Sequence, residues 1–314
     1  MRALEAREGS CSEVDMLARV VSALLAAVLL CANPAGATFR GHNGLIAFTR
    51  WQGEGVEWIA AVSSDGGPEL TLATDAENPA WSADGKRLAF DGPRSGDVYV
   101  ADADGGNVHE LSRPVAREYA PSWSPDGKRL AFVLDPRSDS VYPGIFIATA
   151  DGTALKLVRR WDADLEAPVW SPDGQWIAFL GETGYSRHAE WDLYVIHPNG
   201  KGLRRLTHTG RDEGRPSWSP DGTRLVFARN GKASRSLDIF VLTLRTGRAR
   251  LLIGDPAYDN EPVWSPDGTT IAFVREDLGS GNGMIYLARA NGRNVEHLTT
   301  LSTPASDLDW QPLP

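Results

Sequence analysis

One sequence motif recurs along the chain and limits the folds that the chain can adopt. The motif is Trp-Ser-Pro-Asp-Gly-x-x-φ-Ala-Phe, in which φ is an aliphatic residue, and its copies start 42 to 48 residues apart. Ala83 replaces the proline of the first copy, and Val226 replaces the alanine of the fourth. A fixed period of about 20–50 residues is the signature of a repeat architecture, in which each unit buries its apolar faces against its neighbours. The five complete copies are Trp81–Phe90, Trp123–Phe132, Trp170–Phe179, Trp218–Phe227 and Trp264–Phe273.

A sixth copy is divided between the two ends of the repeat region. Trp310 continues the period near the C-terminus, and Asn43–Phe48 carries the turn and the following strand without a tryptophan. Each unit contains signals for two hairpins, because a second strand and an Asp-Gly or Asn-Gly turn such as Asp104-Gly105 follow the first hairpin, with Thr246-Gly247 as a weaker variant in the fifth unit. Four short antiparallel strands at this period are typical of propeller blades. The sequence therefore predicts an all-β, six-bladed β-propeller with four antiparallel strands per blade, closed by the C-terminal strand, which completes the N-terminal blade. The repeated tryptophans and phenylalanines are predicted to form the core between blades.

The N-terminal segment predicts export. Val20–Ala32 is apolar, follows Arg19 and precedes the small-x-small sequence that ends at Ala37, which is the pattern of a signal peptide. We expect residues 1–37 to be the signal, with cleavage after Ala37 and a true start possible at Met16, and residues 38–314 to be the propeller. The chain then works outside the cytoplasm, in the periplasm or secreted, without membrane insertion after cleavage and as a monomer. The net charge of −9 argues against a nucleic-acid partner.

The repeat resembles the WD-repeat-like propellers of the TolB family, whose units also carry a proline two residues before the tryptophan. Members of that family bind protein partners of the Tol–Pal system of the cell envelope, and the resemblance implies an exported binding protein. The α/β domain that precedes the propeller in TolB has no counterpart in this sequence, so the resemblance covers the propeller alone. The matching prolines are Pro79, Pro121, Pro168, Pro216 and Pro262, while Leu308 takes this place in the last unit.

Acidic residues precede each tryptophan, in the connections between successive blades. These connections and the long loops inside the blades share one face of a propeller, here called the long-loop face, and variable loops on a rigid scaffold usually carry the binding site. We predict that this acidic face binds a protein or peptide partner, with solvation or capping of backbone N–H groups as the alternative role of the carboxylates. The predicted partner-binding residues are Glu77, Glu118, Glu166, Glu213, Glu261 and Asp307.

A long loop in the fourth unit is a further possible contact. Tyr185, Arg187, His188 and Trp191 combine aromatic and cationic side chains, which are typical interface anchors. Packing of Trp191 back onto its blade is the alternative, and the same two possibilities apply to Trp51 and Trp161.

A catalytic constellation is not evident in the sequence. The six histidines are scattered, no zinc-binding spacing and no Gly-x-Ser-x-Gly motif occur, and we expect no cofactor or metal. The favoured interpretation is a non-catalytic scaffold. The alternative is a lyase or hydrolase that acts from the central funnel on a cell-wall or extracellular polysaccharide or on a peptide. Funnel carboxylates beside a histidine or arginine would favour the enzyme, and a lining of small or apolar residues would argue against it.

Overall fold

The computed structural model describes residues 39–52, 56–92, 96–111, 116–135, 142–183, 190–231, 236–254, 257–276, 283–298 and 304–314. All of them belong to the second of two compact units in the chain, residues 35–314. The predicted signal segment, with Met16 and the cleavage site after Ala37, lies outside the described residues and stays a prediction. The described residues form strands and turns without a helix, and none of their segments meets the length and hydropathy of a membrane-spanning helix.

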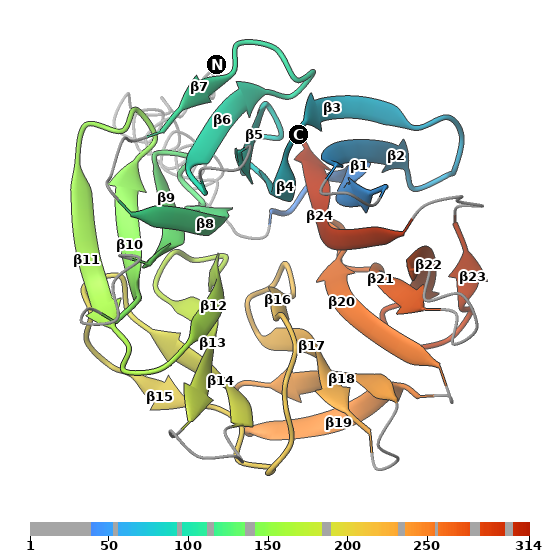
Figure 1. Cartoon of the computed structure of the whole chain (residues 1–314). Coiled ribbons are helices and arrows are strands. Elements are labelled where there is room, and N and C mark those ends of the chain that lie inside the picture. The colour runs from blue at the N-terminus through green and yellow to red at the C-terminus, as the bar shows by residue number, and fades with distance from the viewer. Residues whose placement is uncertain are drawn as a thin grey trace, which may run out of the picture. The chain divides into compact units, whose positions relative to one another are not determined.

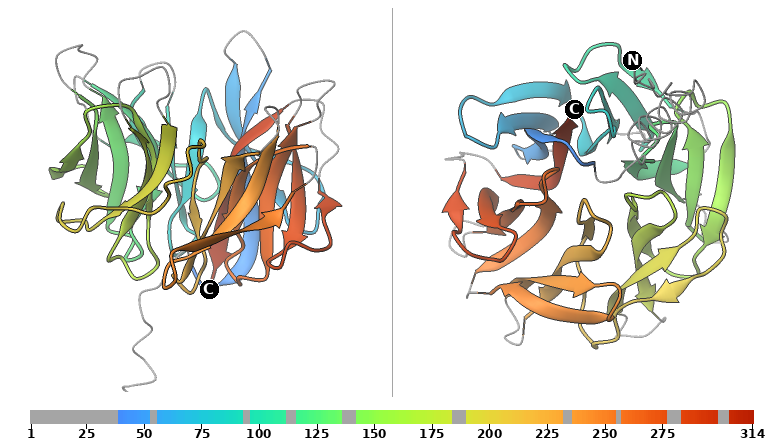
Figure 2. Two further views of the ribbon diagram at one scale, coloured as in Figure 1. Left: turned by 90° about the horizontal axis from the view of Figure 1, so that it is seen from below. Right: turned by 180° about the vertical axis from the view of Figure 1, so that it is seen from behind.

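Antiparallel sheets follow one another around a central axis (Figures 1 and 2). Four of the sheets have four strands each, in which neighbouring strands are antiparallel and, apart from β24 and β1, consecutive in the chain. The first of them is made of β24 (Ala305–Leu313), β1 (His42–Trp51), β2 (Glu57–Ser63) and β3 (Leu70–Thr74). The second is made of β4 (Glu77–Trp81), β5 (Arg87–Asp91), β6 (Val98–Asp102) and β7 (His109–Glu110). The third is made of β8 (Arg117–Trp123), β9 (Arg129–Asp135), β10 (Gly144–Thr149) and β11 (Leu155–Arg160), and the fourth of β12 (Leu165–Trp170), β13 (Ile177–Thr183), β14 (Glu190–Ile196) and β15 (Arg204–Arg205).

The predicted set of six separate four-stranded blades is wrong. The structure has four such blades, and the remaining eight strands form one continuous hydrogen-bonded sheet. The two halves of this sheet join where β19 ends opposite Ile239, because Leu237 of β18 then pairs in parallel with Tyr258 of β20. Each half keeps the antiparallel order of a four-stranded unit. The strands are β16 (Ser217–Trp218), β17 (Arg224–Asn230), β18 (Leu237–Thr243), β19 (Arg248–Ile253), β20 (Tyr258–Trp264), β21 (Thr270–Glu276), β22 (Gly283–Arg289) and β23 (Glu296–His297).

Strand β24 joins the two ends of the repeat region, as the divided sixth copy predicted. It pairs antiparallel with β1 from His42–Leu313 to Arg50–Ala305. Gln311 adds two contacts, since its Oε1 accepts from the Leu45 N–H at 3.1 Å and its Nε2 donates to the Gly85 carbonyl at 2.8 Å. The C-terminal strand is therefore part of the first sheet and also contacts the second.

The Ser-Pro-Asp-Gly turns follow from their residue types. In the turn at Ser124, the Ser124 hydroxyl donates to Asp126 at 2.5 Å and accepts from the Arg129 N–H at 3.0 Å. Gly127 takes the left-handed conformation, with φ at 63°, and its N–H donates to the Ser124 carbonyl at 2.8 Å. Asp and Gly thus fix the tight hairpin that returns the chain into the second strand of each unit.

The repeated aromatic residues form the core, as predicted. The tryptophan and phenylalanine of each complete motif are no more than 3% exposed and pack between neighbouring sheets. The indole N–H of Trp123 donates to the carbonyl of Ala80 in the preceding unit at 3.1 Å, and the Arg87 guanidinium covers the same ring at 4.3 Å. These contacts hold one unit against the next.

A β-bulge interrupts the inner strand of several units and positions the site described below. The residue three before the tryptophan adopts a left-handed conformation, and the pairing register shifts around it, as between Glu77 and Ala80 in β4. Proline, which cannot donate to a sheet ladder, is tolerated at bulges, and it follows this position in most units. The bulge turns the side chain at this position toward the central axis. The left-handed residues are Asn78, Ala120, Ala167, Glu261 and Asp307, with φ between 49° and 55°.

Candidate functional site

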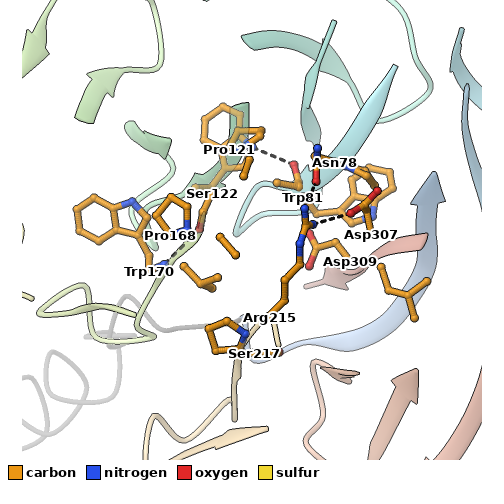
Figure 3. A pocket seen from close by; sticks show the side chains of 18 of the residues that line it. Asn78, Trp81, Pro121, Ser122, Pro168, Trp170, Arg215, Ser217, Asp307 and Asp309 are labelled. Atoms are coloured by element: carbon orange, nitrogen blue, oxygen red, sulfur yellow. Dashed lines mark hydrogen bonds and ion pairs between the residues drawn. The ribbon is translucent and has the colours of Figure 1, made fainter. Parts of the chain in front are cut away.

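The inner strands enclose a cavity of about 110 Å³ on the central axis (Figure 3). Its walls differ in chemistry. One wall is made of small and apolar residues from β8 and β12, and the opposite wall carries polar and charged side chains. The first wall includes Ala120, Pro121, Ser122, Ala167, Pro168 and Val169, and the second includes Asn78, Arg215, Glu261, Asp307 and Asp309.

Arg215 reaches from the connection before β16 to the opposite side of the cavity. Its Nη1 forms an ion pair with Asp307 Oδ1 at 2.7 Å, and its Nη2 donates to Asn78 Oδ1 at 2.5 Å (Figure 3). Burial alone would lower the pKa of Arg215, but the carboxylates of Asp307 and Glu261 raise it, so the guanidinium is held in its charged form. One side chain thereby links three repeat units.

Asp91 lies behind Asn78 and is buried. It accepts hydrogen bonds from the Ala120 N–H at 3.0 Å and from the Asn78 side-chain amide at 2.7 Å. Burial raises its pKa well above the ordinary value, although these hydrogen bonds act in the opposite direction. The chain of contacts Asp91–Asn78–Arg215–Asp307 fixes the orientation of the guanidinium from both ends.

Two further carboxyl groups on the charged wall have strongly shifted pKa values. Asp309 accepts from the Trp81 N–H at 2.6 Å, and Glu261 accepts from the Asp307 N–H. Burial raises the pKa of Asp309 to about 7. Burial, together with the nearby Asp307 carboxylate, raises the pKa of Glu261 to about 7 as well. Both groups therefore change charge near neutral pH, and a cation bound beside them would favour their ionised forms.

Phe39 lines the cavity near the start of the described chain. Its side chain packs against the core cluster that contains Ala80 and Trp123. The same segment is fixed by Gly41, where a Cβ atom would lie 2.2 Å from the Leu313 carbonyl oxygen. Since β1 runs from this end toward the long-loop face, Phe39 forms the floor of the cavity and the long-loop face forms its mouth.

Of the six predicted acidic residues, two line the cavity, two lie near its mouth and two are buried inside the protein. Glu261 and Asp307 line the cavity. Glu166 is exposed, and its charge contributes to the raised pKa of Arg215. Glu77 is half-buried, with the Arg117 guanidinium 3.9 Å away. Burial raises the pKa of Glu77, and Glu57 and Asp307 raise it further, which places it near the same mouth.

Glu118 and Glu213 do not reach the partner-accessible surface. Glu213 is 4% exposed and forms a buried ion pair with Arg229, at 2.8 Å from its Oε2 to Arg229 Nε. Burial raises the pKa of Glu213, partly offset by Arg229. Glu118 is fully buried opposite Leu134, close to the Val98 N–H. Glu118 and Glu213 therefore have the alternative, structural role, because their carboxyl groups lie against the Val98 N–H and the Arg229 guanidinium inside the protein.

The possible contact loop is described only in part. Tyr185, Arg187 and His188 lie outside the described residues. Trp191 is half-buried and packs against the core cluster of Trp218 and Phe227. It therefore packs back onto the propeller, which was the alternative to a contact with a partner. Trp161 also packs inward, 5.4 Å from the Phe179 ring, with its indole N–H bound to the Glu182 carbonyl. Trp51, in contrast, is 50% exposed.

Four polar residues near the cavity were not identified from the sequence. Asn78 and Arg215 stand three before the tryptophan of their units, and Asp309 stands one before Trp310. Alignment of the units on their tryptophans would have shown these positions as variable among otherwise similar repeats. Asp91 follows the phenylalanine of its unit, where the other units carry apolar residues or threonine.

The arrangement allows recognition of a cation and, through its shifted carboxyl groups, proton transfer. None of the described lining residues is a histidine. Within the described part of the chain, no group of three His, Cys, Asp or Glu side chains is placed to hold a metal ion. The cavity combines the two linings that would distinguish an enzyme from a non-catalytic scaffold. One wall carries carboxylates beside an arginine, which favours an enzyme, and the other wall is small and apolar, which argues against one.

Comparison with known proteins settles the family. The family model described as the TolB β-propeller domain matches residues 93–234 and 213–312. The chain belongs to this family. No curated protein matches it significantly.

Solved structures share the fold of this TolB-family propeller at low sequence identity. TolB from Acinetobacter baumannii has a TM-score of 0.73 and 21% identity, over 86% of this chain and 67% of that protein. A structure assigned to TolB of Agrobacterium tumefaciens has a TM-score of 0.66 and 20% identity, over 86% and 99%. An oligogalacturonate lyase in complex with manganese has a TM-score of 0.59 and 15% identity, over 77% and 70%. At these identities the likeness shows the fold alone.

Proposed function

We propose that this chain is an exported, non-catalytic binding propeller that receives a basic segment of a protein or peptide partner at the mouth of the central cavity. The charge balance of the cavity carries the proposal. Among the described residues that line it, Glu261, Asp307 and Asp309 stand against one cationic side chain, Arg215. An enclosed site with surplus carboxylates attracts cations and speeds their association.

The contacts of Arg215 support a preference for guanidinium or ammonium groups. Asp307 and Asn78 hold this guanidinium at hydrogen-bond distance, so the charged wall already has the geometry that such a group requires. The small, apolar wall opposite leaves room for the aliphatic stem of a lysine or arginine side chain. The likeness to TolB structures supports a protein partner and a site of action outside the cytoplasm.

Capture from envelope extract by the mature chain, residues 38–314, tests this proposal. The variant Glu166→Lys adds positive charge at an exposed position near Arg215, where the Glu166 side chain makes no hydrogen bond within the described part of the chain. We expect it to reduce the amount of a specifically captured partner by about tenfold. Glu296→Lys makes the same charge change on the exposed strand β23 and is the matched control. Equal capture by the parent chain and Glu166→Lys would refute a site at the cavity mouth.

A catalytic role in the same cavity is the second candidate. The observation that favours it is the pKa of about 7 of both Glu261 and Asp309, since a carboxylic acid that is partly protonated at neutral pH is suited to general acid catalysis. The fold shared with an oligogalacturonate lyase agrees with this candidate. It predicts product release from an acidic polysaccharide or a peptide library, and loss of that release in Glu261→Gln and Asp309→Asn. Absence of turnover by the parent chain would reject it.

A further inference from the structure

The hairpin between β1 and β2 leaves an aromatic side chain on the long-loop face. Trp51 is 50% exposed and Val56 is 49% exposed, while the residues directly before Trp51 in β1 are buried and those after Val56 in β2 are half-buried and then buried. The Gln52 N–H donates to the Val56 carbonyl at 3.1 Å, so the backbone around both residues is held in the hairpin. An exposed tryptophan on a fixed backbone is the usual form of an interface anchor.

Two carboxyl groups lie beside this tryptophan. Glu57 pairs directly across the ladder from Trp51, which places their side chains on the same face of the sheet, with Cβ atoms about 5 Å apart. The charge of Glu57 also raises the pKa of Glu77, at the start of β4 in the next sheet, so the two carboxyl groups lie close enough to interact. Arg117, at 3.9 Å from Glu77 and half exposed, compensates them weakly.

The carboxyl pair connects the hairpin to the cavity. The charge of Asp307, which lines the cavity and binds Arg215, also acts on Glu77. A partner segment at the mouth therefore meets acidic groups continuously from Asp307 through Glu77 and Glu57 to the indole of Trp51. A positive side chain over the indole face would gain a cation–π contact as well as the carboxylates.

We propose that Trp51, Val56, Glu57 and Glu77 form a docking site for a lysine or arginine side chain of the partner's basic segment. The cation lies over the Trp51 indole beside the carboxyl groups of Glu57 and Glu77, while its aliphatic stem contacts Val56. This proposal rests on the proposed function and extends it, since it sets the path of the partner from the cavity mouth outward to the first hairpin.

The indole N–H resonance of Trp51 tests the site directly. In ¹⁵N-labelled protein, residues 38–314, this resonance is assigned by its loss in Trp51→Phe. The probe is a five-residue peptide of lysine, arginine and glycine blocked at both ends, and the control peptide has glutamate in place of the basic residues. We expect a saturable shift of the Trp51 resonance with the basic peptide alone. The double variant Glu57→Gln/Glu77→Gln should weaken the affinity by about tenfold, and Trp51→Ala by roughly threefold.

The controls separate this site from the cavity. Glu296→Gln changes the same kind of charge on an exposed strand and should leave the affinity unaltered. A Trp51 resonance that does not move, or moves equally with the acidic peptide, overturns the docking site. If Glu166→Lys still weakens peptide binding in that case, the cavity proposal stands and the hairpin proposal alone fails. If neither Glu166→Lys nor the hairpin variants affect binding, both fail.

Discussion

The buried ion pair between Glu213 and Arg229 allows a direct test of whether a predicted binding residue instead stabilises the fold. The side chains are 0% and 8% exposed, and three hydrogen bonds of 2.8 to 3.1 Å join them. Arg229 also lies over the Phe240 ring at 4.5 Å. Arg229→Met keeps an apolar stem over that ring but leaves the Glu213 carboxyl buried without its cation.

The size of the effect follows from the burial. Removal of one partner of a buried pair costs about 3–5 kcal/mol, because the remaining charge has lost its compensation. Replacement of both partners by apolar residues of similar volume is often close to neutral. We therefore expect Arg229→Met to lower the free energy of unfolding by about 3 kcal/mol, and the double variant Glu213→Met/Arg229→Met to recover most of that loss. The chain already contains a unit without this pair, since Leu165 and Gly181 face each other at the equivalent position.

Urea unfolding of the parent chain, both single variants and the double variant at pH 7 measures the coupling as a double-mutant cycle. Near-additive losses, or a cost below about 1 kcal/mol for Arg229→Met, would refute the assignment of this pair as a buried structural contact. Partner capture is a separate readout, and the folded double variant should capture as well as the parent chain, since Glu213 does not reach the surface.

Three other outcomes follow from the structure. Burial raises the pKa of Asp309 and Glu261 to about 7, so the folded state binds these protons more tightly than the unfolded chain. Their contribution to stability is thus largest at low pH and is lost as the pH rises toward 7. The free energy of unfolding of Asp309→Asn should therefore increase by roughly 2 kcal/mol relative to that of the parent chain between pH 5 and pH 8, as measured by calorimetry. A difference that stays constant over this pH range would contradict the raised pKa. Gly292→Ala places a Cβ 2.2 Å from the Leu252 carbonyl oxygen of the preceding unit and should lower the free energy of unfolding in urea by about 3 kcal/mol. Gly247→Ala is the control, because its Cβ meets nothing within 4 Å, and its left-handed φ should cost about 1 kcal/mol. Equal losses would show that the contact between units accommodates the added methyl group. Deletion of residues 305–314 removes the partner of β1 and should abolish cooperative unfolding, so a sharp transition in the truncated chain would show that the ring does not depend on β24.

The sequence predicted those parts of the fold that depend on local chemistry. The turns, the buried aromatic residues and the pairing of the two ends follow from Asp-Gly sequences and from a period that places one tryptophan between each pair of neighbouring units. The number of separate blades was not predictable, because one parallel contact, Leu237 with Tyr258, joins eight strands, and no residue type specifies it. It depends on where β19 ends.

The acidic residues show why the site was predicted only in part. In a regular strand, residues five and three before the tryptophan would point to the same face. Glu213 and Glu261 occupy these two positions in their units, yet one is buried within the sheet and the other lines the cavity. The register shift between Asn260 and Val263 interrupts the alternation at this position, and the left-handed backbone at Glu261 marks it. The proline that follows Glu261 is the one sequence sign of this bulge.

The pairing of β24 with β1 has a consequence for how the molecule is made. Leu45 and Gln311, which bond to each other, are 266 positions apart, so β1 pairs with β2 on one edge but lacks a partner on its other edge until β24 has been synthesised. Contacts of such long range slow folding, because the chain must lose much of its freedom before they form. A chain whose ring cannot close early stays open while it is threaded through a narrow pore. If the export predicted from its N-terminal segment holds, the order of its strands keeps it in a translocation-competent form until its far end arrives.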